Sequence, residues 1–288
     1  MANLSKVGVV VKTGSREAAN LARQLILELE RLGMTAVTDE ESAPALGRES
    51  SISRSSLAGA TDLVVVLGGD GTLLSVTRGV LGTTPILGIN LGTLGFLTEH
   101  PVDHLFPMLH LAIKGGAKVE VRERLEIEVD SPGKPVVLRR ALNDVVINKS
   151  ALARMILLSV HVNGEFLSRF RADGLVIATP TGSTAYNLSA GGPIIYPTVQ
   201  VVLVTPICPH TLTNRPIALP LASEIEIRLE SRSEEVYLTL DGQEGFPLSS
   251  RDLLKIRRCP EPVRLLTDPG RSYFHILHRK LKWGQRGG

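Results

Sequence analysis

Short apolar runs alternate with amphipathic stretches along the first hundred residues of the chain. Residues 7–11, 63–67 and 85–90 are dominated by β-branched and aliphatic side chains. Runs of this length are typical of strands that are buried on both faces of a parallel sheet. Between the first two runs, residues 16–32 carry leucines at helical spacing on one face, and Gly33 is a helix stop signal. The pattern therefore predicts an α/β fold in this part of the chain.

The spacing of apolar residues changes after a short helix that is expected near residues 104–113. Beyond the turn signal at residues 115–116, apolar positions alternate with polar ones, as they do in strands with one face buried. Strands are expected at residues 118–124, 125–129, 136–141, 155–162, 175–178, 201–205, 224–229, 236–240 and 253–258. A β-rich region therefore follows the α/β region.

These patterns predict three parts. An α/β domain with a Rossmann-like parallel sheet is expected over residues 1–115, and a β-rich, β-sandwich-like domain over residues 116–270. Residues 271–288 are expected to form a C-terminal helix that packs back on the first domain, with a disordered tail at 284–288. Residues 43–56 are rich in Ser, Ala and Gly without periodicity, and we expect a loop there that is mobile or lies over the site.

Composition narrows the classes of partner. The 288 residues are 43% apolar, which is enough for a core, and 32 basic and 29 acidic residues are spread along the chain. Only 4% are aromatic and none interleave with a basic stretch, so no nucleic-acid partner is expected. No run has the length of a membrane span, and the two cysteines have no partner at metal-site spacing. We expect a cytoplasmic protein with no membrane partner.

Residues 68–72, with the sequence Gly-Gly-Asp-Gly-Thr, follow the apolar run 63–67 directly. Glycines at the end of a strand let backbone N–H groups approach a phosphate closely, although a tight turn would need them as well. The carboxylate of Asp70 favours a site of chemistry, because it repels phosphate unless it binds a metal, accepts a proton or holds a hydroxyl. Thr72 is expected to cap a helix over residues 73–80.

A second glycine-rich segment, residues 88–97, follows the apolar run that begins at residue 85. If both runs are parallel strands, their carboxyl ends meet at one edge of the sheet, where ligands bind in open α/β folds. The two glycine-rich segments are therefore expected to share one site.

The densest group of small polar residues is the block 173–193, in the predicted β-rich domain. Hydroxyl groups around Gly182 offer donors and acceptors to a polar ligand, and Tyr186 offers a flat surface to an aromatic base. A capped turn before a helix would account for residues 181–184. Because it would not account for the glycine pair 191–192, we favour a ligand site.

Two further carboxylates follow predicted strands, in Asn143-Asp144 and in Asp241-Gly242-Gln243. Amides beside carboxylates suit the paired hydroxyls of a ribose, since they combine donors with acceptors. Each dipeptide is also an ordinary turn sequence, and by itself each is better explained as a turn.

Taken together, these segments resemble the NAD kinase family. The matching segments are residues 68–72, 88–97, 142–144, 173–193, 209–216 and 241–243, and the tail at residues 273–275 and 281–284 is similar to bacterial members. The first motif is shared with diacylglycerol, sphingosine and phosphofructokinase relatives, whereas the block 173–193 is far more specific. The resemblance implies a Mg²⁺-dependent enzyme that transfers the γ-phosphate of ATP to the 2′-hydroxyl of the adenosine ribose of NAD, giving NADP.

The resemblance also implies roles for individual residues. Asp70 is expected to accept the proton of the attacking hydroxyl, and Asn143 with Asp144 to bind ribose hydroxyls of NAD. The NAD contacts that it implies are Asp70, Gly71, Asn143, Asp144, Arg154, Arg171, Asp173, Thr184, Ala185, Tyr186, Asn187, Leu188, Ser189 and Gln243. The phosphate and ATP loop that it implies is Gly68, Gly69, Gly71 and Thr72, and no residue is assigned to the metal.

Two other functions stay open on the sequence. A lipid or sugar kinase could share the Gly-Gly-Asp-Gly-Thr motif, although no membrane-facing surface is visible. A non-catalytic dinucleotide-binding regulator could keep the pocket, although binding alone would gain nothing from the charge of Asp70. The resemblance further implies a homodimer or homotetramer, and it leaves open whether NADH replaces NAD or polyphosphate replaces ATP.

Overall fold

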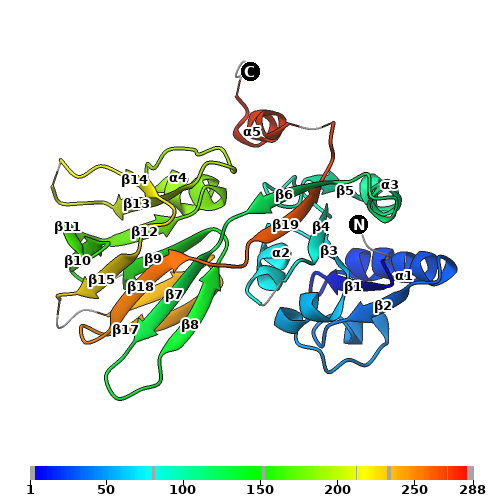
Figure 1. The fold of residues 1–288 in the computed structure, drawn as a ribbon, viewed down its shortest axis with the longest axis horizontal. Helices are drawn as coiled ribbons and strands as arrows, with labels where there is room; N and C mark the ends of the chain where they lie inside the picture. Colours follow the sequence, from blue (N-terminus) through cyan, green and yellow to red (C-terminus); the bar gives the residue numbers. More distant parts are fainter. Residues whose placement is uncertain are drawn as a thin grey trace. The chain divides into compact units, whose positions relative to one another are not determined.

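The computed structural model describes residues 4–79, 82–150, 153–211, 213–231, 235–270 and 272–283. By its internal contacts the chain divides into two units, one of Met1–Val121 with Val263–Gly288 and the other of Arg122–Pro262 (Figure 1). The expectation of a disordered tail at 284–288 falls outside the described residues, as does the end of the helix expected over 73–80.

The first unit is built on a seven-stranded sheet with the order β2-β1-β3-β4-β19-β6, in which β5 also pairs with β4. The pairs β1–β2, β1–β3, β3–β4, β4–β19 and β4–β5 are parallel. The bounds are β1 Lys6–Val11, β2 Thr35–Thr38, β3 Leu63–Gly68, β4 Pro85–Asn90, β5 His100–Pro101, β6 Lys118–Arg122 and β19 Val263–Thr267. This parallel sheet confirms the predicted α/β architecture.

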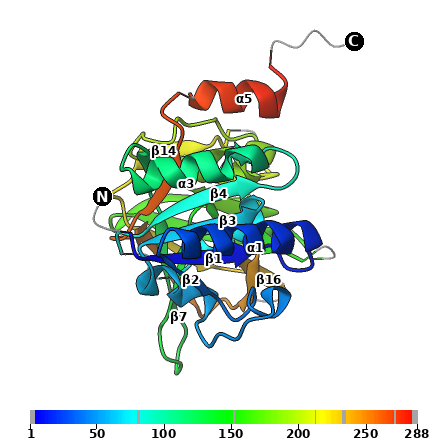
Figure 2. The same ribbon diagram turned by 90° about the vertical axis from the view of Figure 1, so that its right-hand side faces the viewer.

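Helices cover both faces of this sheet because strand residues alternate between the faces. The odd-numbered residues of β1 and β3 share one core with α1 (Arg16–Arg31) and α3 (Leu105–Ile113), and Figure 2 shows both helices on the same side of the strands. The opposite face carries α2 (Asp70–Thr77), since a Cβ at Gly88 of β4 would lie 2.8 Å from the Leu73 side chain. Helix α5 (Tyr273–Leu281) belongs to this unit, and the Lys280 ammonium lies 5.6 Å from the centre of the Phe96 ring.

One local expectation for this unit was wrong. Helix α2 begins at Asp70, with Gly69 in extended conformation as its N-cap residue, so Thr72 lies inside the helix and does not cap it. The segment between β2 and β3, which includes the loop expected at residues 43–56, has neither an α-helix nor a strand. It contains three 3₁₀ turns, at Pro44–Leu46, Arg54–Ser56 and Ala58–Ala60.

The second unit consists of two six-stranded sheets, β11-β10-β15-β18-β7-β8 and β14-β13-β12-β9-β16-β17. Its described pairings are antiparallel, and the inward residues of both sheets form one core. This arrangement confirms the β-rich, sandwich-like prediction. The bounds are β7 Leu125–Asp130, β8 Val137–Ala141, β9 Asp144–Lys149, β10 Ile156–Val162, β11 Glu165–Ala172, β12 Gly174–Ala178, α4 Tyr186–Ser189, β13 Val201–Ile207, β14 Ile217–Pro220, β15 Ile225–Leu229, β16 Val236–Leu240, β17 Glu244–Leu248 and β18 Leu253–Arg258.

The division of the chain differs from the expected boundaries at 115/116 and 270/271. It falls after Val121 and after Pro262, because β6 and β19 both lie in the parallel sheet of the first unit. Strand β19 was not expected from its sequence, which is short and follows Pro262. Within the described part of the chain, no helix is both long and apolar enough to cross a membrane.

Candidate functional site

The glycine-rich motif of the first unit forms the turn from β3 into α2. A Cβ at Gly68 would lie 2.5 Å from the Thr72 hydroxyl oxygen, so this glycine is needed for packing. A Cβ at Gly69 would meet no atom within 4 Å, so the backbone there borders open space. Of these two glycines, Gly69 is the one with room for a ligand against the N-terminus of α2, where backbone N–H groups favour negative charge.

The Asp70 carboxylate holds the second glycine-rich segment in place. Its Oδ2 accepts a hydrogen bond from Phe96 N–H at 2.8 Å, and its Oδ1 accepts from Leu97 N–H at 3.1 Å. The backbone N–H and the hydroxyl of Thr98 also donate to Oδ1, both at 2.9 Å. A Cβ at Gly95 would stand 1.9 Å from Oδ1, so only glycine fits there. Sequence reasoning placed the two segments at one edge and missed that this carboxylate joins them.

Asn90, the last residue of β4, orders the same segment from the other side. Its Oδ1 accepts a hydrogen bond from Gly92 N–H at 2.7 Å, and its Nδ2 donates to the Thr93 carbonyl at 2.8 Å and to the Thr98 hydroxyl at 2.9 Å. The side-chain amide therefore closes the turn that follows β4. Together, Asp70 and Asn90 fix the backbone of residues 92–98 with buried or half-buried hydrogen bonds, which is the kind of support that a precise site requires.

The second unit contains a pocket of about 310 Å³ beside β9, β16 and α4. Four of the predicted NAD contacts line it, namely Asn143, Asp144, Ala185 and Tyr186. Its other lining residues are Val146, Asn148, Thr239, Asp241 and Gly242. Segments that are 40 to 100 positions apart in the sequence therefore meet at one pocket, as the ligand interpretation requires.

Asp241 lines the same pocket, although it is not among the predicted NAD contacts. Its carboxylate accepts hydrogen bonds from three consecutive backbone N–H groups, those of Leu142 at 3.0 Å, Asn143 at 2.7 Å and Asp144 at 3.2 Å. Asp241 has a φ of 51° in the turn between β16 and β17, a conformation that Asp tolerates better than most residues. The Asp-Gly turn signal was visible in the sequence, and the structure shows that the turn also builds the pocket.

Asp144 is a buried carboxyl group on the wall of this pocket, and only 3% of the residue is exposed. Burial raises its pKa to about 7, with a further contribution from the charge of Asp241, while a hydrogen bond from the Tyr186 backbone acts in the opposite direction. Near neutral pH the group is therefore present in both protonation states. Such a carboxyl can donate a hydrogen bond as well as accept one, which suits a ligand hydroxyl.

The block 179–193 packs directly on the turn at residues 142–144. The Thr179 hydroxyl donates to the Leu142 carbonyl at 2.6 Å, and a Cβ at Gly182 would lie 2.0 Å from the carbonyl oxygen of Asn143. Gly182 therefore brings the block against the pocket wall. Tyr186, which lines the same pocket, is 41% exposed, so a base can stack on its ring.

Asn187 has a packing role within the block. Its side chain is fully buried, its amide donates to the carbonyls of Ser183 and Pro193, both at 3.1 Å, and its Oδ1 accepts from the Thr205 hydroxyl at 2.6 Å. A Cβ at Gly192 would lie 2.1 Å from this Oδ1. Close packing on Asn187 therefore explains Gly192, so this glycine does not by itself indicate a ligand site.

The remaining predicted contacts do not line the described pocket. Asp173 is partly exposed between β11 and β12, with its carboxylate 3.8 Å from the Lys149 ammonium. Arg171 is exposed on β11, and Arg154 and Gln243 are exposed outside the strands. Thr184, Leu188 and Ser189 lie in or beside α4, outside the lining set.

Comparisons with known proteins identify the family of the chain. Residues 7–117 match the ATP-NAD kinase N-terminal domain, and residues 142–267 match the ATP-NAD kinase C-terminal domain. The chain is 45% identical over 285 residues to the NAD kinase of Geobacter sulfurreducens, covering 98% of this chain and 100% of that protein. It is 42% identical over 284 residues to the NAD kinase of Solibacter usitatus, covering 98% of this chain and 99% of that one.

Two solved structures share the fold over nearly the whole chain. A yeast NADH kinase complexed with NADH superposes with a TM-score of 0.88 at 27% identity, covering 100% of this chain and 90% of the yeast chain. An NAD kinase from Archaeoglobus fulgidus in complex with ATP superposes with a TM-score of 0.76 at 26% identity, covering 97% of this chain and 100% of the archaeal one. On the domain matches and the full-length identity, this chain belongs to the NAD kinase family.

Proposed function

We propose that the protein transfers the γ-phosphate of ATP to the 2′-hydroxyl of the adenosine ribose of NAD, giving NADP and ADP. The observation that carries this proposal is the pocket of the second unit, which groups Asn143, Asp144 and Tyr186 around space for a ribose and its base. Family membership supports the reaction class, and the ligands of the two solved relatives, NADH and ATP, support the two substrates.

NAD is proposed to bind with its ribose hydroxyls on Asn143 and Asp144 and its base on Tyr186. Asp144 can accept from one hydroxyl and donate to another, because its pKa of about 7 leaves it partly protonated. Gly71, Arg154, Arg171, Asp173, Thr184, Ala185, Leu188, Ser189 and Gln243 remain proposed contacts of the dinucleotide. Asn187 is proposed to act through packing, since its amide is already fully used inside the protein.

The phosphates of ATP are proposed to bind at residues 68–72. The open space beside Gly69 and the N-terminus of α2 support this assignment, because the positive end of a helix dipole attracts phosphate. The Thr72 side chain packs against Gly68, so we propose that Thr72 maintains the shape of the turn.

Asp70 is proposed as the proton acceptor. Its Oδ1 already accepts three hydrogen bonds, whereas Oδ2 accepts one from Phe96 and can accept a second from the ribose hydroxyl. As the hydroxyl oxygen bonds to the γ-phosphorus, its proton passes to Oδ2 and the bond from phosphorus to the ADP oxygen breaks. A base in this role typically accelerates a reaction about 10²- to 10⁴-fold.

The one carboxylate of the motif, Asp70, accepts four hydrogen bonds and is proposed to accept a fifth from the ribose hydroxyl. Among the described residues, no group of three His, Cys, Asp or Glu side chains could hold a metal. We therefore propose that Mg²⁺ is carried by the phosphates of ATP, which is how this ion commonly reaches such enzymes. No protein ligand is assigned to it.

One assay tests the proposed function. Purified protein is incubated with NAD, ATP and Mg²⁺, and NADP is measured with an NADP-specific dehydrogenase; we expect turnover. Absence of NADP would refute the proposal, and calorimetric binding of NAD without turnover would instead identify a regulator. Phosphorylation of a diacylglycerol or a sugar in place of NAD would identify the lipid or sugar kinase alternative.

We also propose that the protein acts in the cytoplasm as a homodimer or homotetramer, as its relationship to the family implies. Light scattering on the purified protein gives its mass in solution. A mass of one chain across the micromolar range would refute the oligomer.

A further inference from the structure

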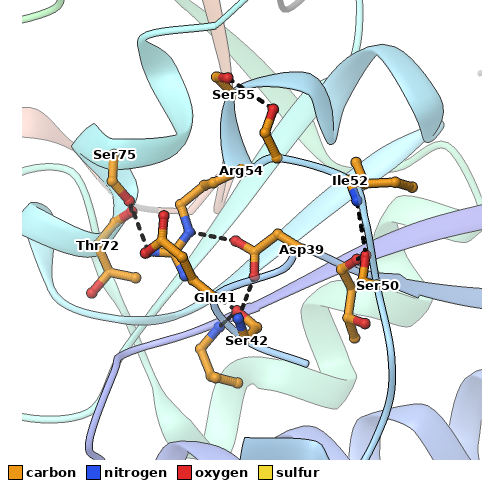
Figure 3. Close-up of polar contacts among 12 residues, drawn as sticks. Asp39, Glu41, Ser42, Ser50, Ile52, Arg54, Ser55, Thr72 and Ser75 are labelled. Atoms are coloured by element: carbon orange, nitrogen blue, oxygen red, sulfur yellow. Dashed lines mark hydrogen bonds and ion pairs between the residues drawn. The ribbon is translucent and has the colours of Figure 1, made fainter. Parts of the chain in front are cut away.

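The segment between β2 and β3 contains a buried ionic cluster that has no part in the reaction as described so far (Figure 3). The Asp39 side chain is fully buried, and that of Arg54 is 8% exposed. Arg54 Nε donates to the Asp39 carboxylate, whose other oxygen accepts from Ser42 N–H at 2.6 Å. Burying two charges is costly, so the pair is weak evidence for stability and suggests a role in specifying geometry.

The guanidinium of Arg54 reaches beyond this pair to helix α2. Its Nη1 lies 3.3 Å from the Ser75 hydroxyl, which itself donates to the Thr72 carbonyl at 2.7 Å. The same nitrogen lies 2.9 Å from a carboxylate oxygen of Glu41, which is half exposed. Arg54 therefore connects two acidic groups of the β2–β3 segment to the helix that begins at Asp70, as the sticks in Figure 3 show.

The other arm of the guanidinium fixes the cluster to the sheet. Nη2 of Arg54 donates to the Ser42 hydroxyl at 3.3 Å, and this hydroxyl accepts from the backbone N–H of Val11, the last residue of β1, at 3.0 Å. The planar guanidinium thus joins the carboxyl ends of β1 and β2 to α2. A lysine could not make these contacts together, because its ammonium is a single point charge.

A second contact holds α2 from the same segment. A Cβ at Gly79, just beyond the helix, would lie 1.7 Å from the backbone carbonyl oxygen of Ser55. Residues 54 and 55 therefore contact α2 in its last turn, at Ser75, and beyond its end, at Gly79. This contact does not depend on the charges of the cluster.

We infer that Arg54 is a positioning residue for phosphoryl transfer, which sets the place of α2 and so of residues 69–72 at its start. The inference rests on the proposed function of those residues in binding the phosphates of ATP. This role does not require Arg54 to contact either substrate. It acts by holding the helix against the sheet edge, and misplacement of reacting groups by about 1 Å can cost about 100-fold in rate.

Two substitutions test the inference in the full-length protein. Arg54→Lys keeps the charge and loses the planar contacts. Ser75→Ala removes the contact with α2 and leaves the buried pair with Asp39 intact, so it remains informative if the lysine variant folds poorly. We expect each to lower kcat/KM for ATP about tenfold or more, while KM for NAD stays within about twofold. Ser75→Thr, which keeps the hydroxyl, is expected to restore most of the loss.

Matched controls are Arg48→Lys, at an exposed residue of the same segment, and Ser53→Ala, at a half-buried serine whose hydroxyl bonds the hydroxyls of Ser55 and Ser56. Both should leave the kinetics of ATP and NAD unchanged. The inference would be overturned if both test variants kept kcat/KM for ATP within twofold of the wild type. It would also be overturned if KM for NAD rose by the same factor as kcat/KM for ATP fell. Failure of the wild-type protein to form NADP would refute the proposed function instead, so the two failures can be told apart.

Discussion

The variant Asp144→Asn is expected to be more stable than the wild-type protein at pH 8 and about equally stable at pH 4. In the wild type, burial and the charge of Asp241 raise the pKa of Asp144 to about 7. The folded protein thus holds this proton more tightly than the unfolded chain does. The contribution of Asp144 to the free energy of unfolding is fully present below the pKa of the unfolded chain. It is lost as the pH rises from that value through the pKa of the folded protein.

The size of the effect follows from the two pKa values. An aspartate in an unfolded chain titrates near 3.9, and each unit between the two states corresponds to about 1.4 kcal/mol. A folded pKa of about 7 therefore gives a loss of about 4 kcal/mol between pH 4 and pH 8. Asparagine has nearly the same shape, does not titrate, and keeps an oxygen for the hydrogen bond from the Tyr186 backbone.

Urea unfolding of both proteins at several pH values between 4 and 8 measures this difference. Subtracting the two free energies of unfolding at each pH removes the titration of groups that the variants share. The gap should open in favour of the asparagine variant as the pH rises, by roughly 2–4 kcal/mol. A gap that stays within about 1 kcal/mol would refute the reasoning, as would one that opens in the opposite direction.

Three further predictions concern activity and packing. Asp70→Asn is expected to lower NADP formation about 10²- to 10⁴-fold with native circular dichroism retained, and activity within tenfold of wild type would remove its role as proton acceptor. Gly69→Ala should leave the melting temperature nearly unchanged and raise KM for ATP. Gly95→Ala should lower both the melting temperature and the activity, because its Cβ would lie 1.9 Å from the Asp70 carboxylate. Equal melting temperatures of these two variants would contradict the prediction. Gly192→Ala should destabilise the second unit by about 1–3 kcal/mol in denaturant unfolding by displacing the Asn187 amide, and a neutral result would show that the amide can move without cost.

The architecture was predictable where one physical signal dominated. Aliphatic runs such as residues 63–67 are typical of strands that are buried on both faces of a parallel sheet, and β3 is found in such a sheet. The alternating pattern after residue 116 predicted a β-rich domain, because one face of each strand is buried, and the described pairings of that domain are antiparallel. Strand β19 was missed because five residues between a proline and a turn carry little pattern, and its place depends on β4, which is far away in the sequence.

The site was predictable as a set of segments rather than as a set of contacts. Asn143, Asp144 and Tyr186 do meet at one pocket, but their meeting depends on Asp241, whose turn sequence has many possible uses. Gly192 was interpreted as part of a ligand site, although it is needed for packing. A glycine that is needed for packing cannot be distinguished in sequence from one that makes room for a ligand. The buried group that it contacts, Asn187, is identified only by the fold.

Strand β19 also determines how the protein can be made and divided. Val263–Thr267 lies between β4 and β6 in the parallel sheet, so the sheet formed by the first 121 residues stays incomplete until residues near 267 have been synthesised. During translation the sandwich of residues 122–262 is complete in sequence before that strand emerges. A fragment that ends at Val121 would leave part of β4 as an open edge, which is a template for aggregation. A version of the parallel-sheet unit that keeps Val263–Thr267, for example one made by circular permutation, should therefore express better than a fragment truncated at Val121.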